Sequence, residues 1–197
     1  MAGRPRRFEE TAVLDSAMKI FWAKGYEATS YSMLSEAMRM NTPSIYGAFG
    51  DKESLFLKVI DRYVEGYGKP TFLGLSESKT CREGFTVFLS LRIKQILNAE
   101  HPGCLVATVL ADAAPLSPQF ENKLKVLLNA LDDLIAQRIQ RGIVEGDLSA
   151  KTEPKALARI LHCLIIGLAT RARARESERS LRAIANDSLN LMFGSPR

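Results

Sequence analysis

Residues 30–55 read SYSMLSEAMRMNTPSIYGAFGDKESL. Apolar residues recur in this segment at helical spacing, and three side chains that commonly begin helices, Ser30, Asn41 and Asp51, divide it. Pro43 suits the first turn of the middle helix, because a proline lacks the N–H that would have no partner there. The segment therefore predicts two short helices joined by a tight turn, followed by the start of a longer helix.

The middle helix of this segment has two different faces. Ile45 and Phe49 are apolar and are expected to anchor it to its neighbours, whereas Thr42, Ser44 and Tyr46 can face outward. A short helix with small hydrogen-bonding or aromatic side chains on its outer face suits the major groove of B-DNA, which is about 12 Å wide. The pattern predicts a helix-turn-helix that reads double-stranded DNA.

Helical spacing continues on both sides of this segment, and the alternation typical of strands is nearly absent. Upstream lies an apolar stripe that Gly25 ends, formed by Leu14, Ala17, Met18 and Phe21. Downstream, the fourth helix fades in the glycine- and proline-rich residues 66–70, unless a long helix crosses into a second module. Further helices are expected over 84–99, over 104–113, from 120 for five or six turns until Gly142 and Gly146, over 157–174, and from Ser177 or Ser180 onward.

We therefore predict an all-α fold with two domains. Residues 1–52 are expected to form an N-terminal three-helix DNA-binding domain with the helix-turn-helix. Residues 53–197 are expected to form a larger C-terminal helical domain.

Composition narrows the class of protein. The chain has 197 residues, 27 Lys and Arg against 22 Asp and Glu, a net charge of +5, and 46% hydrophobic residues, which is typical of a globular protein. The longest apolar stretch, residues 161–169, is far shorter than the roughly 18 residues that span a bilayer. The basic start lacks the apolar core of a secretory signal, and three cysteines without a CxxC pair suit a reducing compartment. We expect a cytoplasmic protein without a membrane partner.

Enzymatic function is not expected. The sequence contains no GxSxG, HExxH, P-loop or GxGxxG motif. Its two histidines, His101 and His162, leave few general acid–base groups and too few ligands for a dedicated zinc site. We expect no catalytic residues, no cofactor and no metal.

The first third of the chain resembles the tetracycline-repressor (TetR) family of bacterial transcription regulators. The resemblance is carried by the stripe from Leu14 to Phe21, by GYEATS at residues 25–30, by Leu34 and Ala37, by PSIY at 43–46 and by FGDKESL at 49–55. It implies an N-terminal DNA-binding domain, a helical domain for ligand binding and dimerisation, and repression that a small molecule relieves. GRPR at residues 3–6 is also familiar from this family.

The resemblance and the residue types together give a set of expected DNA contacts. The arm around Arg4, Arg6 and Arg7 precedes the first helix and could lie along the backbone or enter the minor groove. Lys52 stands near a helix N-terminus, where charge and dipole both favour phosphate. The complete predicted set is Arg4, Arg6, Arg7, Ser30, Tyr31, Thr42, Pro43, Ser44, Tyr46, Gly47 and Lys52.

Two departures from the family pattern affect this set. Arg39 and Met40 stand where the family often has a Gly-Val pair, so the turn between the two short helices is expected to differ slightly. Gly47 and Ala48 stand where it usually has a bulky polar or aromatic residue. Fewer side chains can then reach bases, and the residues at 42–46 are expected to carry more of the readout.

Each of these features also has a purely structural interpretation. Helix caps occur in any protein, Tyr46 and Phe49 could both be core aromatics, and the arm could be a disordered tail. Charge does not decide between the two, because the first fifty residues hold six basic and five acidic side chains, a net charge of +1. The ordered spacing favours DNA binding over a helical adaptor that binds no DNA.

The C-terminal two thirds are expected to bind an effector and to form a homodimer. Candidate effector-binding residues are Tyr63, Tyr67, Phe85, Phe88, Arg92 and Cys104. The window 161–169 is apolar nearly all round, and small residues such as Gly167 permit close helix approach, which favours a dimer seam. The seam is expected to pair the long helix from Phe120 with the helix from Leu157, or the latter with the last helix.

Cys104 raises an alternative mode of response. It follows His101, Pro102 and Gly103 near an expected helix N-terminus, where the dipole makes a thiol more reactive. The alternative function is a thiol- or metal-responsive regulator acting through Cys104. A small buried cysteine without any sensing role is the competing interpretation.

Overall fold

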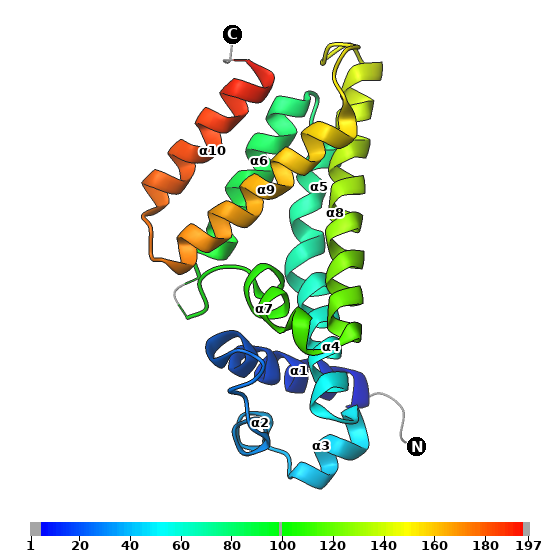
Figure 1. Ribbon diagram of the computed structural model, residues 1–197, viewed down its shortest axis with the longest axis vertical. Coiled ribbons are helices and arrows are strands. Elements are labelled where there is room, and N and C mark those ends of the chain that lie inside the picture. The colour runs from blue at the N-terminus through cyan, green and yellow to red at the C-terminus, as the bar shows by residue number, and fades with distance from the viewer. Residues whose placement is uncertain (1–4, 99, 195–197) are drawn as a thin grey trace.

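The computed structural model describes residues 5–98 and 100–194, without the side chains of residues 5–9, 73, 74 and 76. These residues form helices and turns and no strand, which confirms the all-α prediction. The α-helices are α1 (Pro5–Lys24), α2 (Tyr31–Met38), α3 (Thr42–Phe49), α4 (Lys52–Tyr63), α5 (Lys69–Glu77), α6 (Cys81–Ile96), α7 (Ala111–Ala113), α8 (Pro118–Val144), α9 (Pro154–Arg173) and α10 (Glu178–Phe193). Figure 1 shows α1, α2 and α3 at one end of the molecule, with the long helices stacked above them.

The predicted caps fix the lengths of the short helices. The side chains of Ser30, Asn41 and Asp51 each accept a hydrogen bond from the backbone N–H three residues on, at 3.3, 2.9 and 2.8 Å. The stripe on α1 ends at Gly25, which has a φ of +83°. These features were predictable because each depends on only a few neighbouring residues.

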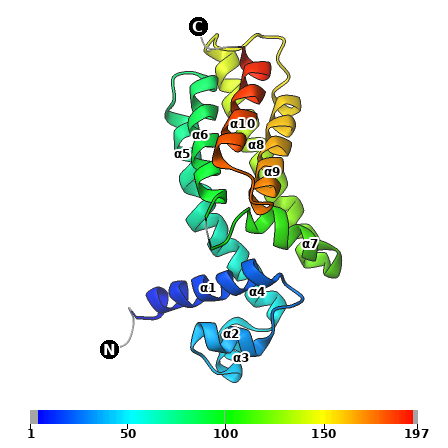
Figure 2. The same cartoon turned by 90° about the vertical axis from the view of Figure 1, so that its left-hand side faces the viewer.

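Helix α4 joins the two parts of the molecule. Leu55, Phe56, Val59 and Ile60 are fully buried, and α4 packs along α1, which lies across its lower end in Figure 2. The helical conformation does not end at residues 66–70, where the fourth helix was expected to fade. The chain passes through a π-helical turn, Val64–Gly68, directly into α5. Pro70 fits there because it occupies the first turn of α5.

The other helix boundaries differ from expectation in three places. Helix α6 begins at Cys81, since Thr80 and Glu83 form a capping box. The helix expected over 104–113 is a π-helical turn, Val106–Leu110, followed by the single turn of α7. Helix α8 runs through Gly142, which was expected to end it. A Cβ at this position would collide with the Cys81 sulfur, so the glycine allows α8 to approach the start of α6 closely.

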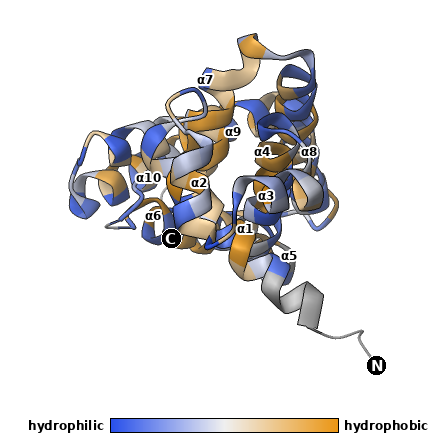
Figure 3. Ribbon diagram, turned by 90° about the horizontal axis from the view of Figure 1, so that it is seen from below, coloured by the Kyte–Doolittle hydropathy of each residue, from blue (hydrophilic) through white to orange (hydrophobic). Residues whose placement is uncertain are grey.

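The C-terminal part is a layered helical bundle. Helix α8 packs on α9, α5 on α6, and α10 on α6. Seen from below, the hydrophobic segments of α4 and α9 lie toward the middle of the molecule (Figure 3). None of the helices in the described ranges is both long and apolar enough to cross a lipid bilayer.

Arg39 holds the turn between α2 and α3 in an unusual conformation. It caps α2 with φ 53° and ψ 40°, the left-handed region that an arginine adopts at a cost of about 1–2 kcal/mol. Its N–H bonds to the carbonyls of Glu36 and Ser35 at the end of α2. This geometry explains why a glycine would suit the position better than the arginine found here.

We expect Arg39→Gly to raise the free energy of unfolding by about 0.5–1 kcal/mol, because the relieved strain exceeds the added freedom of the unfolded chain. Urea unfolding at a fixed protein concentration measures this. Glu36→Gly, within α2, is the matched control and should lower the same free energy by about 1 kcal/mol. A loss of stability in Arg39→Gly would contradict the strain argument.

Candidate functional site

The outer face of α3 is uncharged and projects from the end of the molecule farthest from α10. Ile45 and Phe49 are buried under it, as predicted. Its exposed residues are Pro43, Ser44, Tyr46, Gly47 and Ala48, and Tyr46 is 48% exposed. A helix anchored on one side and open on the other can enter a groove of DNA without unfolding its own support.

Two side chains of α2 fix the direction of α3. The ring of Tyr31 stacks on Tyr46 with centroids 4.6 Å apart. Burial and the neighbouring Tyr46 raise the pKa of the Tyr31 phenol, so its buried hydroxyl stays protonated. Ser35 lies 3.1 Å from the Thr42 hydroxyl, so Thr42 is half-buried against α2, whereas an outward direction was expected. Stacking on Tyr31 therefore holds the exposed side chain of Tyr46 at the open face.

Lys52 has partners within the chain. Its ammonium donates to the carbonyls of Tyr26, Thr29 and Glu27 at 3.1, 3.1 and 3.4 Å, and it lies 4.5 Å from the centre of the Tyr26 ring. The lysine therefore ties the loop between α1 and α2 to the start of α4. A phosphate contact from Lys52 stays a prediction.

Lys58 is a basic residue near α3 that the sequence-based prediction did not include. Its ammonium approaches the carbonyl of Ala48 at 3.5 Å and the ring of Phe49 at 5.3 Å, at the C-terminal end of α3. The contact depends on the angle between α3 and α4, so residue spacing alone carries no signal for it.

The basic arm differs from expectation. Helix α1 begins at Pro5, so Arg6 and Arg7 lie in its first turn and do not precede it. A proline is well suited to the first helical position, which explains the early start. The side chains of these two arginines, and Arg4 as a whole, lie outside the described residues, and their contacts with DNA stay predictions.

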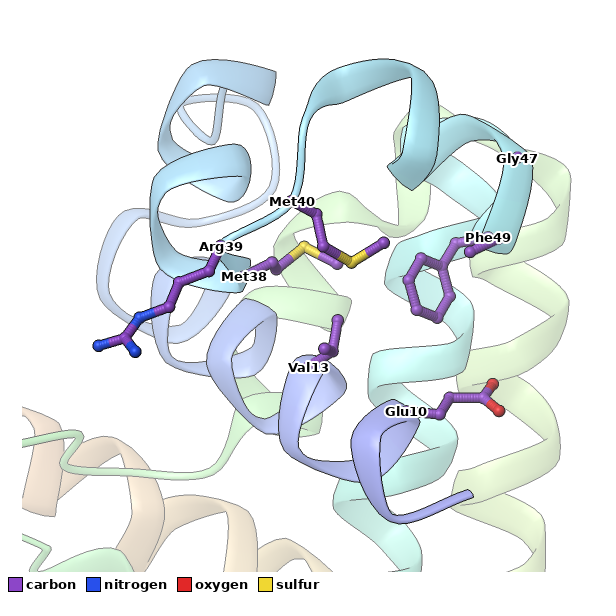
Figure 4. A pocket seen from close by; sticks show the side chains of 8 residues that line it. Glu10, Val13, Met38, Arg39, Met40, Gly47 and Phe49 are labelled. Carbon is purple, nitrogen blue, oxygen red and sulfur yellow. The ribbon is translucent and has the colours of Figure 1, made fainter. Parts of the chain in front are cut away.

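A groove of about 710 Å³ lies beneath the turn between α2 and α3. Figure 4 shows the sulfur-containing side chains of Met38 and Met40 above Val13, while Arg39 and Glu10 point away on opposite sides. Flexible methionines under the turn allow the spacing of α2 and α3 to adjust with little loss of contact.

A second cavity, of about 260 Å³ and partly open to solvent, lies in the C-terminal part between α4, α5, α6, α8 and α9. Of the predicted effector residues, Tyr63, Arg92 and Cys104 line it. Tyr67, Phe85 and Phe88 do not: Phe85 stacks on Phe193, Phe88 stacks on Phe72, and Tyr67 is partly exposed. The lining that the prediction missed comes chiefly from α8 and α9, whose apolar residues were assigned to a dimer seam: Leu127, Leu128, Leu131, Leu134, His162, Ile165, Ile166 and Ala169.

The polar groups of this cavity form a small network around Cys104. The Tyr63 hydroxyl donates to the Cys104 sulfur at 3.3 Å, and Arg92 Nη2 lies 3.8 Å from the same atom. Burial raises the pKa of the Tyr63 phenol, which keeps this donor protonated. On the far wall, His162 Nδ1 lies 2.7 Å from a carboxylate oxygen of Asp132. The cavity thus combines a largely apolar lining with a few polar groups, as binding sites for small molecules do.

Comparison with known proteins identifies this architecture. Residues 13–59 match the model of bacterial regulatory proteins of the tetR family, and residues 92–187 match the tetracyclin repressor-like C-terminal domain. The transcriptional repressor ComR of Escherichia coli is 31% identical over 191 residues, which cover 96% of this chain and 91% of ComR. The chain belongs to the TetR family.

Two further TetR-family relatives support this assignment. The repressor BdcR of Escherichia coli is 28% identical over 139 residues, covering 71% of this chain and 70% of BdcR. A cysteine mutant of the regulator CifR, solved with 26-base-pair operator DNA, superposes with a TM-score of 0.87 at 32% identity, covering 95% of this chain and 98% of CifR. The chain is therefore a transcription regulator with a DNA-binding helix-turn-helix, and not an enzyme.

Aromatic contacts connect the cavity of this TetR-family chain to its DNA-binding end. Trp22 of α1 meets Tyr63 edge-on at 5.2 Å and Tyr67 at 5.9 Å, and it stacks on His101 at 5.6 Å. His101 lies three residues before Cys104, so one tryptophan touches both the end of α4 and the loop that carries the thiol. A change of shape in the cavity wall can reach α1 through this ring.

The same contact makes stability depend on pH. Burial lowers the pKa of His101 below its usual value of 6.5, and Lys19 acts in the same direction, although Glu100 opposes them. The native state therefore favours neutral His101. The stability that this preference adds is fully present above the pKa of the histidine in the unfolded chain. It is lost as the pH falls from there to the lower pKa of the folded state. We expect the melting temperature to fall between about pH 7.5 and 5.5, and to fall less in His101→Phe, which keeps a ring on Trp22. If the melting temperature fell equally with pH in the wild type and in His101→Phe, His101 would not be the source of the effect.

Proposed function

We propose that the protein is a ligand-responsive repressor that binds a palindromic operator as a homodimer and leaves it when a small molecule fills the cavity. The observation that carries this proposal is the uncharged, outward α3, connected by the continuous α4 to a largely apolar cavity. ComR and BdcR are named repressors, and CifR was solved on operator DNA, which supports the same role here. Such a protein acts in the cytoplasm, where its operator lies.

The proposed coupling runs through α4. Tyr63, Val64 and Gly68, at the end of α4 and in the π-helical turn, line the cavity, while the start of α4 supports α3. A π-helical turn is a strained element that commonly occurs at functional sites. Filling the cavity would shift this turn, tilt α4 and change the distance between the two α3 helices of a dimer. We accordingly assign residues 1–52 to the reading domain and 53–197 to the regulatory domain.

The proposed dimer seam follows the outer face of α9. Uncharged residues recur along this face every three or four positions, and Ile160 is 55% exposed. The stripe consists of Ala156, Ile160, Cys163, Gly167, Thr170 and Ala174. Leu191 on the neighbouring α10 is 89% exposed. Exposed apolar residues on two adjacent helices favour the pairing of α9 and α10 over that of α8 and α9.

Fluorescence anisotropy with the gene's own upstream DNA tests the proposal. We expect tight binding that weakens steeply with salt, because several phosphates are neutralised, and at least about a thousandfold preference over random DNA. Equal binding to both DNAs at moderate salt would favour a helical adaptor instead.

A second candidate mode of release is covalent. Cys104 lines the cavity beside the Tyr63 hydroxyl and Arg92, so an electrophile that enters the cavity would meet the thiol. Among the described residues no cluster suited to a metal ion was found, so the observations favour an electrophile over a metal in this mode. If Cys104→Ser responds to electrophiles as the wild type does, the thiol is not the sensor.

A further inference from the structure

Arg92 is a buried cation without a counter-charge among the described residues. Its side chain lines the cavity from α6 and the residue is 8% exposed. Within the part of the chain that the structure describes, its hydrogen bonds reach only neutral groups, the Gln95 amide oxygen at 2.6 Å and the Cys104 sulfur, and its Nε has no partner. No ion pair found in the described ranges includes Arg92.

Two other arginines shielded from solvent, Arg62 and Arg138, differ in this respect. Arg62 binds both carboxylate oxygens of Asp15, at 2.8 and 2.9 Å. Arg138, which is more buried than Arg92, has a carboxylate oxygen of Glu145 at 4.0 Å and donates to the carbonyl of Ser78, although its Nε, like that of Arg92, has no hydrogen-bond partner among the described residues. Because a buried charge is normally paired, the missing partner of Arg92 points to something that the cavity binds.

The rest of the cavity defines the other end of such a ligand. Apart from the Cys104 group, Lys69 and His162, its walls are mostly aliphatic and aromatic, with Phe72 and Leu131 among them. The ammonium of Lys69 pairs with Glu65. His162 cannot supply a second ionic contact with its Nδ1, since Asp132 engages that atom. A volume of about 260 Å³ lies just below the usual range for small-molecule sites, roughly 300–1,000 Å³, so the ligand is small.

We propose that the effector is a small amphipathic monocarboxylate whose head pairs with Arg92 and whose apolar body fills the space between α8 and α9. The planar guanidinium has donors in a fork that matches a carboxylate, and Nε, which is unpartnered, is one of them. This inference rests on the proposed function, because it names the chemical class that would trigger release.

Octanoate and octanol are the probes that test the inference, since they share a chain length and differ in charge. Titration into the full-length protein, followed by melting temperature and calorimetry, should show octanoate binding at least about tenfold tighter than octanol. Octanoate should also release the protein from its operator DNA. Equal affinity for the two probes, or no binding of octanoate, would overturn the inference.

Arg92→Met separates a binding role from a structural one. Replacing an unpaired buried charge with an apolar side chain of similar length is often neutral or stabilising. We expect the ligand-free variant to melt at or above the wild-type temperature and to bind the two probes equally. Arg138→Met, the control, should melt lower, because it removes the donor to the Ser78 carbonyl and the Cys81 sulfur and the charge that faces Glu145. A retained preference for octanoate in Arg92→Met would overturn the inference.

Arg92→Lys provides a second variant that keeps the charge, and it should keep a preference for octanoate even if Arg92→Met fails to fold. Loss of the preference in a folded Arg92→Lys that still melts as the wild type would count against charge recognition.

Operator binding without any probe is measured in parallel. A protein that binds its operator and is released by neutral molecules alone refutes the carboxylate class and leaves the proposed function intact, whereas failure to bind the operator refutes the proposed function itself.

Discussion

Replacing Gly47 with leucine should reduce operator affinity by about a hundredfold without unfolding the protein. Gly47 lies on the exposed face of α3, and a Cβ built there meets no atom within 4 Å. The free protein therefore accommodates a side chain, and helix propensity even improves by up to about 1 kcal/mol. On DNA, the same side chain would occupy the space through which α3 approaches the bases.

Anisotropy titrations and thermal melting of the same preparation give both quantities. Gly47→Ala is the matched control and should melt higher than the wild type, with a much smaller loss of affinity than Gly47→Leu. If Gly47→Leu binds the operator as tightly as the wild type, the outer face of α3 does not approach DNA closely at this point.

The second large effect is expected at the proposed dimer seam. Gly167 is in the middle of the uncharged stripe on α9, and within its own chain a Cβ there also meets no atom within 4 Å. A side chain can therefore begin there without a clash inside the chain, so a weaker dimer with unchanged helicity would report contact with a second copy of the chain. We expect the dimer dissociation constant to rise by about a hundredfold or more, as for a residue at the centre of an interface, while helicity is retained.

Light scattering and sedimentation over a range of concentrations measure the dissociation constant. Leu191→Glu on α10 should also produce monomers, whereas Val126→Glu on α8, which is 53% exposed, should not. Monomers from Val126→Glu and dimers from Leu191→Glu would instead assign the seam to α8 and α9. An unchanged dimer in Gly167→Leu would contradict a seam along this stripe.

The parts of the fold that depend on near neighbours were predictable from the sequence. The caps at Ser30, Asn41 and Asp51 and the buried pair Ile45 and Phe49 follow from residue type and spacing alone. The continuation of α4 into α5 was left open, because a π-helical turn preserves helical spacing through glycines that usually end a helix. Gly142 was misjudged for a related reason, since its role is set by Cys81, far away in the sequence.

The functional sites were predictable to different degrees. The open face of α3 is local and agrees with the prediction except at Thr42, which turns toward Ser35. The cavity requires five helices to meet, so only Tyr63, Arg92 and Cys104 of its predicted residues line it. The apolar residues of α9 face both inward and outward, and no sequence pattern divides them between cavity and seam.

Chemical probing of the operator tests the central claim, that α3 enters the major groove of DNA, most directly. Methylation by dimethyl sulfate reports the major-groove nitrogen of guanine, and the wild-type protein should protect guanines in two half-sites about one helical turn, or a related distance, apart. Tyr46→Ala and Gly47→Leu should lose this protection at concentrations where the wild type is fully bound. Protection that persists unchanged in both variants, or tight binding without any major-groove protection, would contradict the account.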